Sequence, residues 1–278
     1  MLTQRLRTSA VGIPIITAVI FLDGAVYTSV VAGVLALAII EFCAIAEHPT
    51  EQHRLWHPTL PAGVAAVAIV IIVAILDANV DDWPANGSTV VVLGAAVTLG
   101  FVMAPVVTQI SSRREVKRWA LAGLGLVYIG CLGVHFIPLR DLANGEEWVL
   151  LAIIGTWATD TFAYAFGRAI GKRKLAPKMS PGKTKEGTAA GIIGGFASVF
   201  AIAAILDLPM STGEALFVAI TLPPLAILGD LLESWVKRKA NVKDTSALLP
   251  GHGGVLDRLD SLLLTVPLVY WFAALVVL

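Results

Sequence analysis

Long apolar runs alternate with short polar segments along most of the chain. A helix that crosses a membrane needs about 20 mostly apolar residues. The first run is shorter than this, and Asp23 and Gly24 after it suggest the tip of a tight helical hairpin. The pattern predicts about nine transmembrane helices, at residues 11–22, 25–46, 60–76, 89–110, 119–138, 148–167, 187–207, 214–231 and 260–278.

The distribution of Lys and Arg orients these spans, because both residues are retained on the cytoplasmic side of a membrane. With a cytoplasmic N-terminus, the inside segments hold all of the 20 Lys and Arg residues except Arg140. A single span over 11–46 would instead place the basic segment 111–118 outside and the acidic loop 77–88 inside. We therefore expect a multi-pass protein of the cell (plasma) membrane whose polar segments 168–186 and 232–259 face the cytoplasm.

The amino-acid composition is also that of a membrane protein. Hydrophobic residues make up 57% of the chain and charged residues 14%, whereas soluble domains have about 45–50% and about 25%. Residues 1–150 resemble simple membrane spans joined by short loops. Residues 151–278 contain two long polar loops, 168–186 and 232–259, and form the expected catalytic region.

The densest polar stretch lies between residues 230 and 260. Asp230 ends an apolar span, where an ionisable residue is costly and marks a functional candidate, and Ser234 shares its helix face. The segment Pro250–Gly254 contains three glycines and predicts a sharp turn with exposed backbone N–H groups. Asp257 and Asp260 are three residues apart, a spacing that places both carboxylates on one side of a helix. Basic residues follow Asp230 at Lys237, Arg238, Lys239 and Lys243.

These residue types suit phosphoryl or nucleotidyl transfer. Carboxylates supply the oxygen ligands that Mg²⁺ prefers, while basic side chains and backbone donors bind phosphate. We expect Asp230, Asp257 and Asp260 to meet around a cation at the inner membrane surface. Alternatively, the basic residues anchor the span on the inside, and the last two aspartates pair with Arg258 and Lys243.

A second polar stretch covers residues 160–187. Asp160 interrupts an apolar span, again at a cost. Ser180 and Lys183 could contact phosphate or a lipid headgroup, although Pro177 excludes a G-x-x-x-x-G-K-[ST] phosphate-binding loop. The basic residues of the loop could instead bind anionic lipid. Outside both stretches, Glu41 in the second span could pair with a buried base or face a cavity.

The order and spacing of these residues resemble the signature of the phosphatidate cytidylyltransferases, or CDP-diacylglycerol synthases. The matching residues are Ser234-x-x-Lys237-Arg238, Lys243-Asp244 and Pro250-x-His252-Gly253-Gly254-x-x-Asp257-Arg258-x-Asp260. A second family segment is similar to Ser180-Pro181-x-Lys183-Thr184-x-Glu186-Gly187, and a third to Asp160 with Tyr164, Gly167 and Arg168. The resemblance covers about residues 155–262.

The resemblance implies an all-α polytopic membrane enzyme that converts phosphatidic acid and CTP into CDP-diacylglycerol and pyrophosphate. It implies a homodimer and a two-cation site with Mg²⁺ and a monovalent cation such as K⁺. Asp230, Asp257 and Asp260 would be the metal-linked carboxylates. The residues that would meet nucleotide or pyrophosphate oxygens are Lys237, Arg238 and Lys243. The remaining substrate-binding residues would be Asp160, Ser180, Lys183, Thr184, Glu186, Ser234, Asp244, His252, Gly253, Gly254 and Arg258.

CTP, phosphatidic acid and membrane lipids are thus the expected partners, and nucleic acid is not. Two alternatives remain open: a related CTP-dependent lipid-alcohol kinase, and a membrane transporter. A transporter binds its solute near the bilayer midplane, which the long polar loop at 232–259 fits poorly.

Overall fold

A computed structural model describes residues 2–22, 24–47, 120, 124–248 and 253–278 of the chain. It divides into two compact units. The first comprises Met1–Ile137 and Ala240–Arg258, and the second comprises Pro138–Lys239 and Leu259–Leu278. The described residues are mostly helical, which confirms the predicted fold class in its coarse form. Two of the predicted spans, 60–76 and 89–110, lie outside the described residues.

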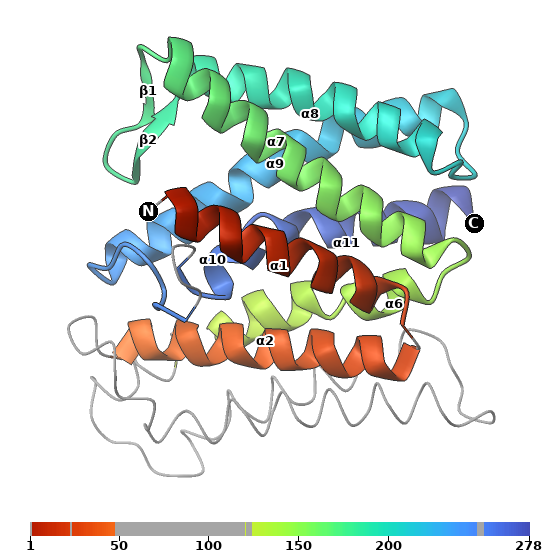
Figure 1. The fold of residues 1–278 in the computed structure, drawn as a ribbon, viewed down its shortest axis with the longest axis horizontal. Helices are drawn as coiled ribbons and strands as arrows, with labels where there is room; N and C mark the ends of the chain where they lie inside the picture. The colour runs from red at the N-terminus through yellow and green to blue at the C-terminus, as the bar shows by residue number, and fades with distance from the viewer. Residues whose placement is uncertain (1, 23, 48–119, 121–123, 249–252) are drawn as a thin grey trace. The chain divides into compact units, whose positions relative to one another are not determined.

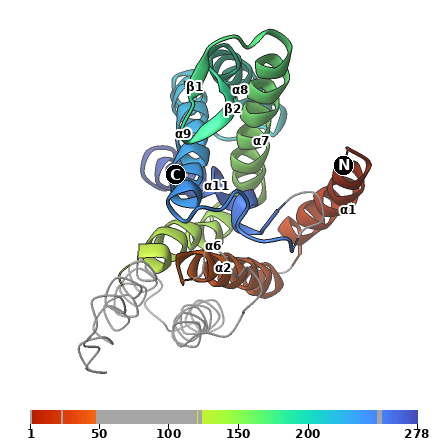
Figure 2. The same ribbon diagram turned by 90° about the vertical axis from the view of Figure 1, so that its left-hand side faces the viewer.

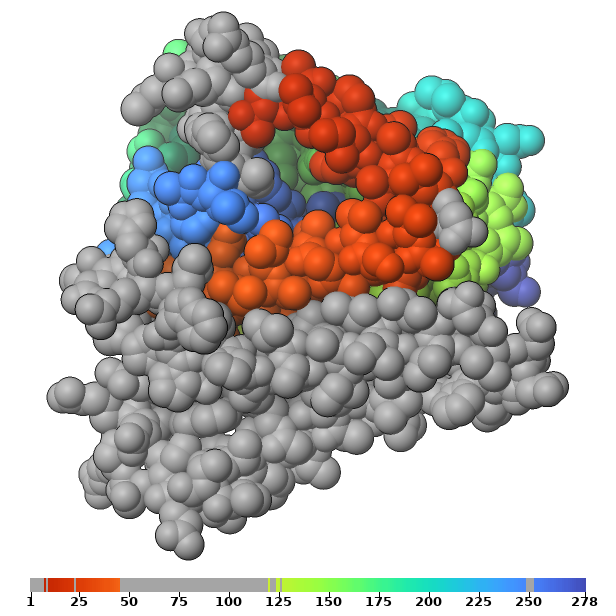
Figure 3. All heavy atoms as spheres, turned by 60° about the horizontal axis from the view of Figure 1, so that its bottom comes forward, coloured from red at the N-terminus to blue at the C-terminus, as the bar shows by residue number. Residues whose placement is uncertain are grey.

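The first unit is built around two consecutive apolar helices, α1 (Leu2–Ile20) and α2 (Gly24–Glu47). They pack side by side, α1 in red and α2 in orange in Figure 3. The break between them coincides with the predicted tip of a helical hairpin. A short π-helical segment, η1 (Leu126–Cys131), packs against α2, and Tyr27 Oη of α2 donates to Phe136 O at 3.1 Å.

The second unit is a bundle of long helices, α7 (Gly145–Ile170), α8 (Lys185–Ile205) and α9 (Thr212–Lys239). They pack against one another, as do α7 and α9 with α11 (Leu262–Phe272) (Figure 1). Small residues allow the close approach of α8 to its neighbours, since a Cβ on Gly191 would lie 3.0 Å from Thr159 O. A hydrogen bond of 2.8 Å between Thr156 Oγ1 and Thr265 Oγ1 joins α7 to α11 in the core.

The remaining described helices are short: α6 (Phe136–Arg140), α10 (Leu256–Leu259) and the π-helical η2 (Ala273–Val277). Of the described helices, four are long and apolar enough to cross a membrane: Gly24–Ile45, Gly145–Ile170, Lys185–Ile205 and Thr212–Lys239. Each corresponds to a predicted span. The count of nine and the cytoplasmic N-terminus remain predictions.

A β-hairpin connects α7 to α8 and adds a small sheet to the predicted helices. Strand β1 (Lys174–Ala176) pairs antiparallel with β2 (Ser180–Thr184), with Lys174 opposite Thr184. The hairpin lies where α7 ends and α8 begins, and it also approaches α9 (Figure 2). The predicted loop 168–186 is therefore an ordered platform at one end of the bundle.

Candidate functional site

The candidate residues of α9 lie on a helix that extends beyond its predicted end at residue 231. Ser234 Oγ donates to Asp230 Oδ1 at 3.3 Å, which confirms that the two share one helix face. One residue before Ser234, the nearly fully buried Glu233 forms an ion pair of 2.6 Å with Lys237. The sequence analysis did not single out Glu233, although its i,i+4 spacing from Lys237 was the available signal.

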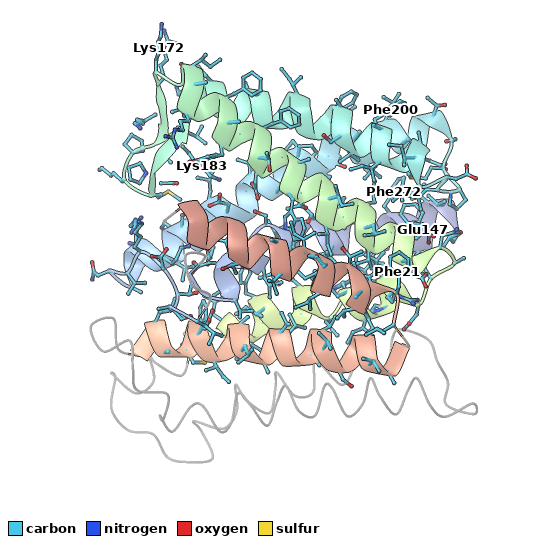
Figure 4. The ribbon with its side chains drawn as sticks, viewed as in Figure 1. Phe21, Glu147, Lys172, Lys183, Phe200 and Phe272 are labelled. Carbon is cyan, nitrogen blue, oxygen red and sulfur yellow. The ribbon has the colours of Figure 1, made fainter. Side chains whose placement is uncertain are left out.

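Lys183 of β2 reaches across to α9. Its Nζ lies 2.7 Å from Asp230 Oδ2, and the side chains are 20% and 28% exposed. In Figure 4, Lys183 lies on the inner side of the hairpin, whereas Lys172 points away from it. The ion pair joins two motifs that the sequence analysis had selected separately, one from each polar stretch.

The hairpin is held in this position by several further bonds. Arg238 Nε of α9 donates to Met179 O at 3.1 Å, between the two strands. Thr184 caps α8, because its Oγ1 accepts from Gly187 N at 3.1 Å, and Glu186 accepts from the backbone N–H groups of Lys172 and Arg173. Three predicted substrate-binding or catalytic residues thus also position the platform.

Asp260 belongs to the same unit as Asp230. A Cβ on Gly229 would lie 2.6 Å from Asp260 O and 2.8 Å from the Cα of Ser261, so the two backbones are in contact. Because Asp230 follows Gly229 directly, both carboxylate-bearing residues lie on touching segments. Ser261 N donates to Asp260 Oδ1 at 2.6 Å. Asp257 lies on α10, which ends at Leu259, so the two aspartates do not share one helix.

Asp257 lies in the first unit, on α10, and is buried. Its Oδ2 accepts from Thr245 N at 2.9 Å and Gly254 N at 2.7 Å, and it lies 3.0 Å from Thr245 Oγ1. Gly253 has a φ of 81°, which favours glycine. Sequence reasoning missed Thr245, whose hydroxyl also contacts Glu41 Oε2.

The other predicted residues are placed as follows. Lys243, Asp244 and Arg258 are exposed in the first unit. Asp160 on α7 and Ser180 at the start of β2 are half-buried in the second. His252 lies outside the described residues.

The donor chemistry of Asp230 and Asp260 fits Mg²⁺, which usually takes one or two protein carboxylates and completes its shell with substrate phosphates and water. Among the residues that the structure describes, no three His, Cys, Asp or Glu side chains are grouped so as to hold a metal ion. Asp257 belongs to the other unit, so its convergence with these two carboxylates remains a prediction.

Comparisons with known proteins agree with the signature. The model of the cytidylyltransferase family matches residues 3–276. A phosphatidate cytidylyltransferase of Staphylococcus epidermidis is 35% identical over 210 residues, 76% of this chain and 78% of the relative. Another from Staphylococcus aureus is 30% identical over 249 residues, 90% of each chain. One from Bacillus subtilis is 40% identical over 153 residues, 55% of this chain and 57% of the relative.

Proposed function

This chain belongs to the cytidylyltransferase family, and we propose that it transfers the cytidylyl group of CTP to phosphatidic acid. The products are CDP-diacylglycerol and pyrophosphate. The relatives named phosphatidate cytidylyltransferase support this reaction, since two of them align with more than two thirds of the chain.

The structural observation that most supports the proposal is the ion pair between Lys183 and Asp230. It brings a cation suited to phosphate next to a carboxylate suited to a metal, at one end of an apolar helix bundle. Such a pair can separate when substrate binds, since a phosphate group can replace the carboxylate at the ammonium group. Lys237 and Arg238 lie on the same helix, about two turns beyond Asp230 and about one turn beyond Ser234, and supply further positive charge.

The transfer needs no strong general base, because the attacking phosphate oxygen of phosphatidic acid is already anionic. That oxygen forms a bond to the α-phosphorus of CTP, and the bond from this phosphorus to the oxygen bridging to the β-phosphate breaks. Pyrophosphate leaves with the electron pair of the broken bond. Positioning of the two substrates and neutralisation of charge on the phosphates account for most of the catalysis.

In this scheme Lys183 binds a substrate phosphate, as does Ser180 at the start of the same strand. Lys237, Arg238 and Lys243 neutralise nucleotide and pyrophosphate oxygens. Asp230, Asp257 and Asp260 would hold Mg²⁺, which would supply positive charge to the α- and β-phosphates, with a monovalent cation such as K⁺ beside it.

The proposal also includes the location of the active site in the membrane. CTP arrives from water while phosphatidic acid stays in the leaflet, so the active site faces the cytoplasm at the surface of the cell membrane. Nine spans with a cytoplasmic N-terminus satisfy the Lys and Arg distribution. We also infer a homodimer and no nucleic-acid partner.

The position of a phosphorus label tests the proposed reaction. The purified protein is supplied with Mg²⁺, phosphatidic acid in mixed micelles, and CTP labelled at either the α- or the γ-phosphate. We expect label from the α position in a lipid product that co-migrates with CDP-diacylglycerol, and label from the γ position in pyrophosphate.

The alternatives give different outcomes when dolichol or phytol is added to this assay and when the protein is reconstituted in liposomes. A lipid-alcohol kinase transfers the γ label to dolichol or phytol and leaves phosphatidic acid unchanged. A transporter moves a solute across liposomes without turnover of CTP. Either result, with no α label in lipid, would contradict the proposal.

A further inference from the structure

Glu41 is a buried acidic residue on the apolar helix α2, with only 6% of its surface exposed. Both of its carboxylate oxygens accept two hydrogen bonds. Oε1 accepts from Ser246 Oγ at 2.7 Å and Val255 N at 3.0 Å. Oε2 accepts from Thr245 Oγ1 at 3.0 Å and Leu256 N at 2.9 Å.

These four donors explain how a carboxylate is accommodated in an apolar helix. Taking an ionised carboxylate out of water is costly unless it is hydrogen-bonded. The partners that the structure describes for Glu41 are hydroxyl and backbone N–H groups, rather than the buried base that the sequence suggested as one option. All four come from two stretches that are distant in sequence from α2, residues 245–246 and 255–256.

The bonds of Glu41 continue into those of Asp257. Thr245 Oγ1 contacts Glu41 Oε2 and Asp257 Oδ2, each at 3.0 Å. The backbone N–H of Leu256, the residue before Asp257, donates to Glu41. Little space is left between these groups, because a Cβ on Gly254 would collide with both Thr245 Oγ1 and Glu41 Oε2.

We propose that Glu41 is a positioning residue for the cytidylyl transfer. It holds Thr245 and Leu256 in fixed places, and through them it sets the position of Asp257 and of Gly254, without contacting substrate itself. Lys243 and Asp244 immediately precede Thr245, so the same bonds restrain the predicted nucleotide contacts. The inference rests on the proposed function and adds a residue from the N-terminal region to its site.

Steady-state kinetics separate positioning from a purely structural role. A partly unfolded preparation contains less active enzyme, so it shows a lower kcat with an unchanged KM for CTP. If loss of the Glu41 carboxylate shifts Asp257 and Gly254, the folded protein binds CTP less well, and the KM for CTP rises. We expect Glu41→Ala to lower kcat/KM for CTP at least about tenfold, as expected when hydrogen bonds to a charged group are lost, with a higher KM.

Conservative variants extend the test. Glu41→Gln keeps one acceptor oxygen and the side-chain shape, so we expect a smaller loss than with Glu41→Ala. Thr245→Val removes the shared hydroxyl and should raise the KM for CTP, whereas Thr245→Ser keeps the hydroxyl and should stay near wild type. Ser29→Ala is the matched control, because Ser29 is an exposed residue of α2 whose hydroxyl donates to Ala25 O of the same helix.

The experiment measures kcat and KM for CTP, with size-exclusion chromatography and thermal unfolding in detergent, for wild type and these five variants. Should Glu41→Ala fail to fold, Glu41→Gln and Thr245→Val decide by the same KM criterion. An unchanged KM for CTP in every folded variant overturns the inference while wild-type turnover still upholds the proposed function. Absence of CDP-diacylglycerol from the wild type instead overturns both.

Discussion

Lys183 Nζ of the hairpin lies 2.7 Å from Asp230 Oδ2 of α9, and this contact joins the two polar stretches of the sequence within one unit. The pair is partly shielded from water, and Arg238 fixes the hairpin on the same helix through Met179 O. A basic group suited to phosphate and a carboxylate suited to Mg²⁺ therefore neutralise each other in this structure.

Replacement of Lys183 tests the phosphate-binding role. We expect Lys183→Ala to lower kcat/KM about tenfold or more through a higher KM for phosphatidic acid or CTP, because a charge-assisted hydrogen bond to phosphate is lost. Stability should fall by less than about 1 kcal/mol, since partly exposed ion pairs contribute little. Kinetics with each substrate varied in turn provide the measurement.

Lys172→Ala is the matched control for Lys183. Lys172 belongs to the same basic loop but points away from α9 (Figure 4), and its bond to Glu186 uses the backbone N–H. We expect near-normal kinetics for this control. Equal effects of the two substitutions would indicate a general requirement for positive charge and would argue against a specific role for Lys183.

The aspartates of the last motif can be neutralised without removing their local hydrogen bonds. In Asp257→Asn and Asp260→Asn, the amide oxygen can still accept from Gly254 N and Ser261 N, so both proteins should fold. We expect turnover to fall at least about 100-fold, as when groups that stabilise transition-state charge are removed.

Asp207→Asn controls for the loss of one negative charge. Asp207 is exposed in the turn between α8 and α9 and has a φ of 49°, a conformation that Asn tolerates. This variant should retain full activity. Near-normal turnover of folded Asp257→Asn or Asp260→Asn would remove that residue from the proposed metal-binding set.

The close contact between Gly229 and the Asp260–Ser261 backbone leaves no room for a larger side chain at position 229. Gly229→Ala should destabilise the protein by about 1–3 kcal/mol, because the new methyl group overpacks a tight contact, and should lower activity by displacing Asp230 and Asp260. On the same helix, a Cβ on Gly213 has Ser211 Oγ, at 4.0 Å, as its nearest tertiary neighbour among the described residues, so Gly213→Ala is the control. Thermal unfolding in detergent should show a lower Tm for the first variant alone, and equal Tm values would contradict the close contact.

The apolar pattern predicted the helices of the second unit well and their contacts poorly. The predicted spans 148–167, 187–207 and 214–231 correspond to α7, α8 and α9, because run length determines where a membrane helix can form. The last of these extends to Lys239 because polar residues end an apolar run without breaking a helix. The strands of the hairpin were not predicted, because they are too short to show an alternating pattern of apolar and polar residues.

Long-range partners were beyond prediction from one sequence. Lys183 and Asp230 were both selected for their chemistry, but only tertiary packing pairs them. Glu41 was noticed as an acid in an apolar span. Its donors at 245–246 and 255–256 could not be inferred, since hydroxyl and backbone N–H groups carry no distinctive pattern. At the break between α10 and α11, Ser261 N donates to the side chain of Asp260, a local bond that is an alternative to the bonds of a helix.

Removal of divalent metal provides a further prediction. Treatment with EDTA should abolish formation of CDP-diacylglycerol, and added Mg²⁺ should restore it, because the phosphates and the carboxylates at 230 and 260 repel one another without a cation between them. Activity should be measured together with metal content by mass spectrometry of the treated protein. Full activity of verified metal-free enzyme would contradict the proposed role of the aspartates.

Stoichiometry tests the central claim most directly. Wild-type protein is incubated with CTP, Mg²⁺ and phosphatidic acid, and CDP-diacylglycerol and pyrophosphate are quantified in the same samples over time. The proposed reaction predicts that the two products accumulate in equal amounts, and that neither forms when phosphatidic acid is omitted. Release of CDP or pyrophosphate without an equal amount of CDP-diacylglycerol would contradict it.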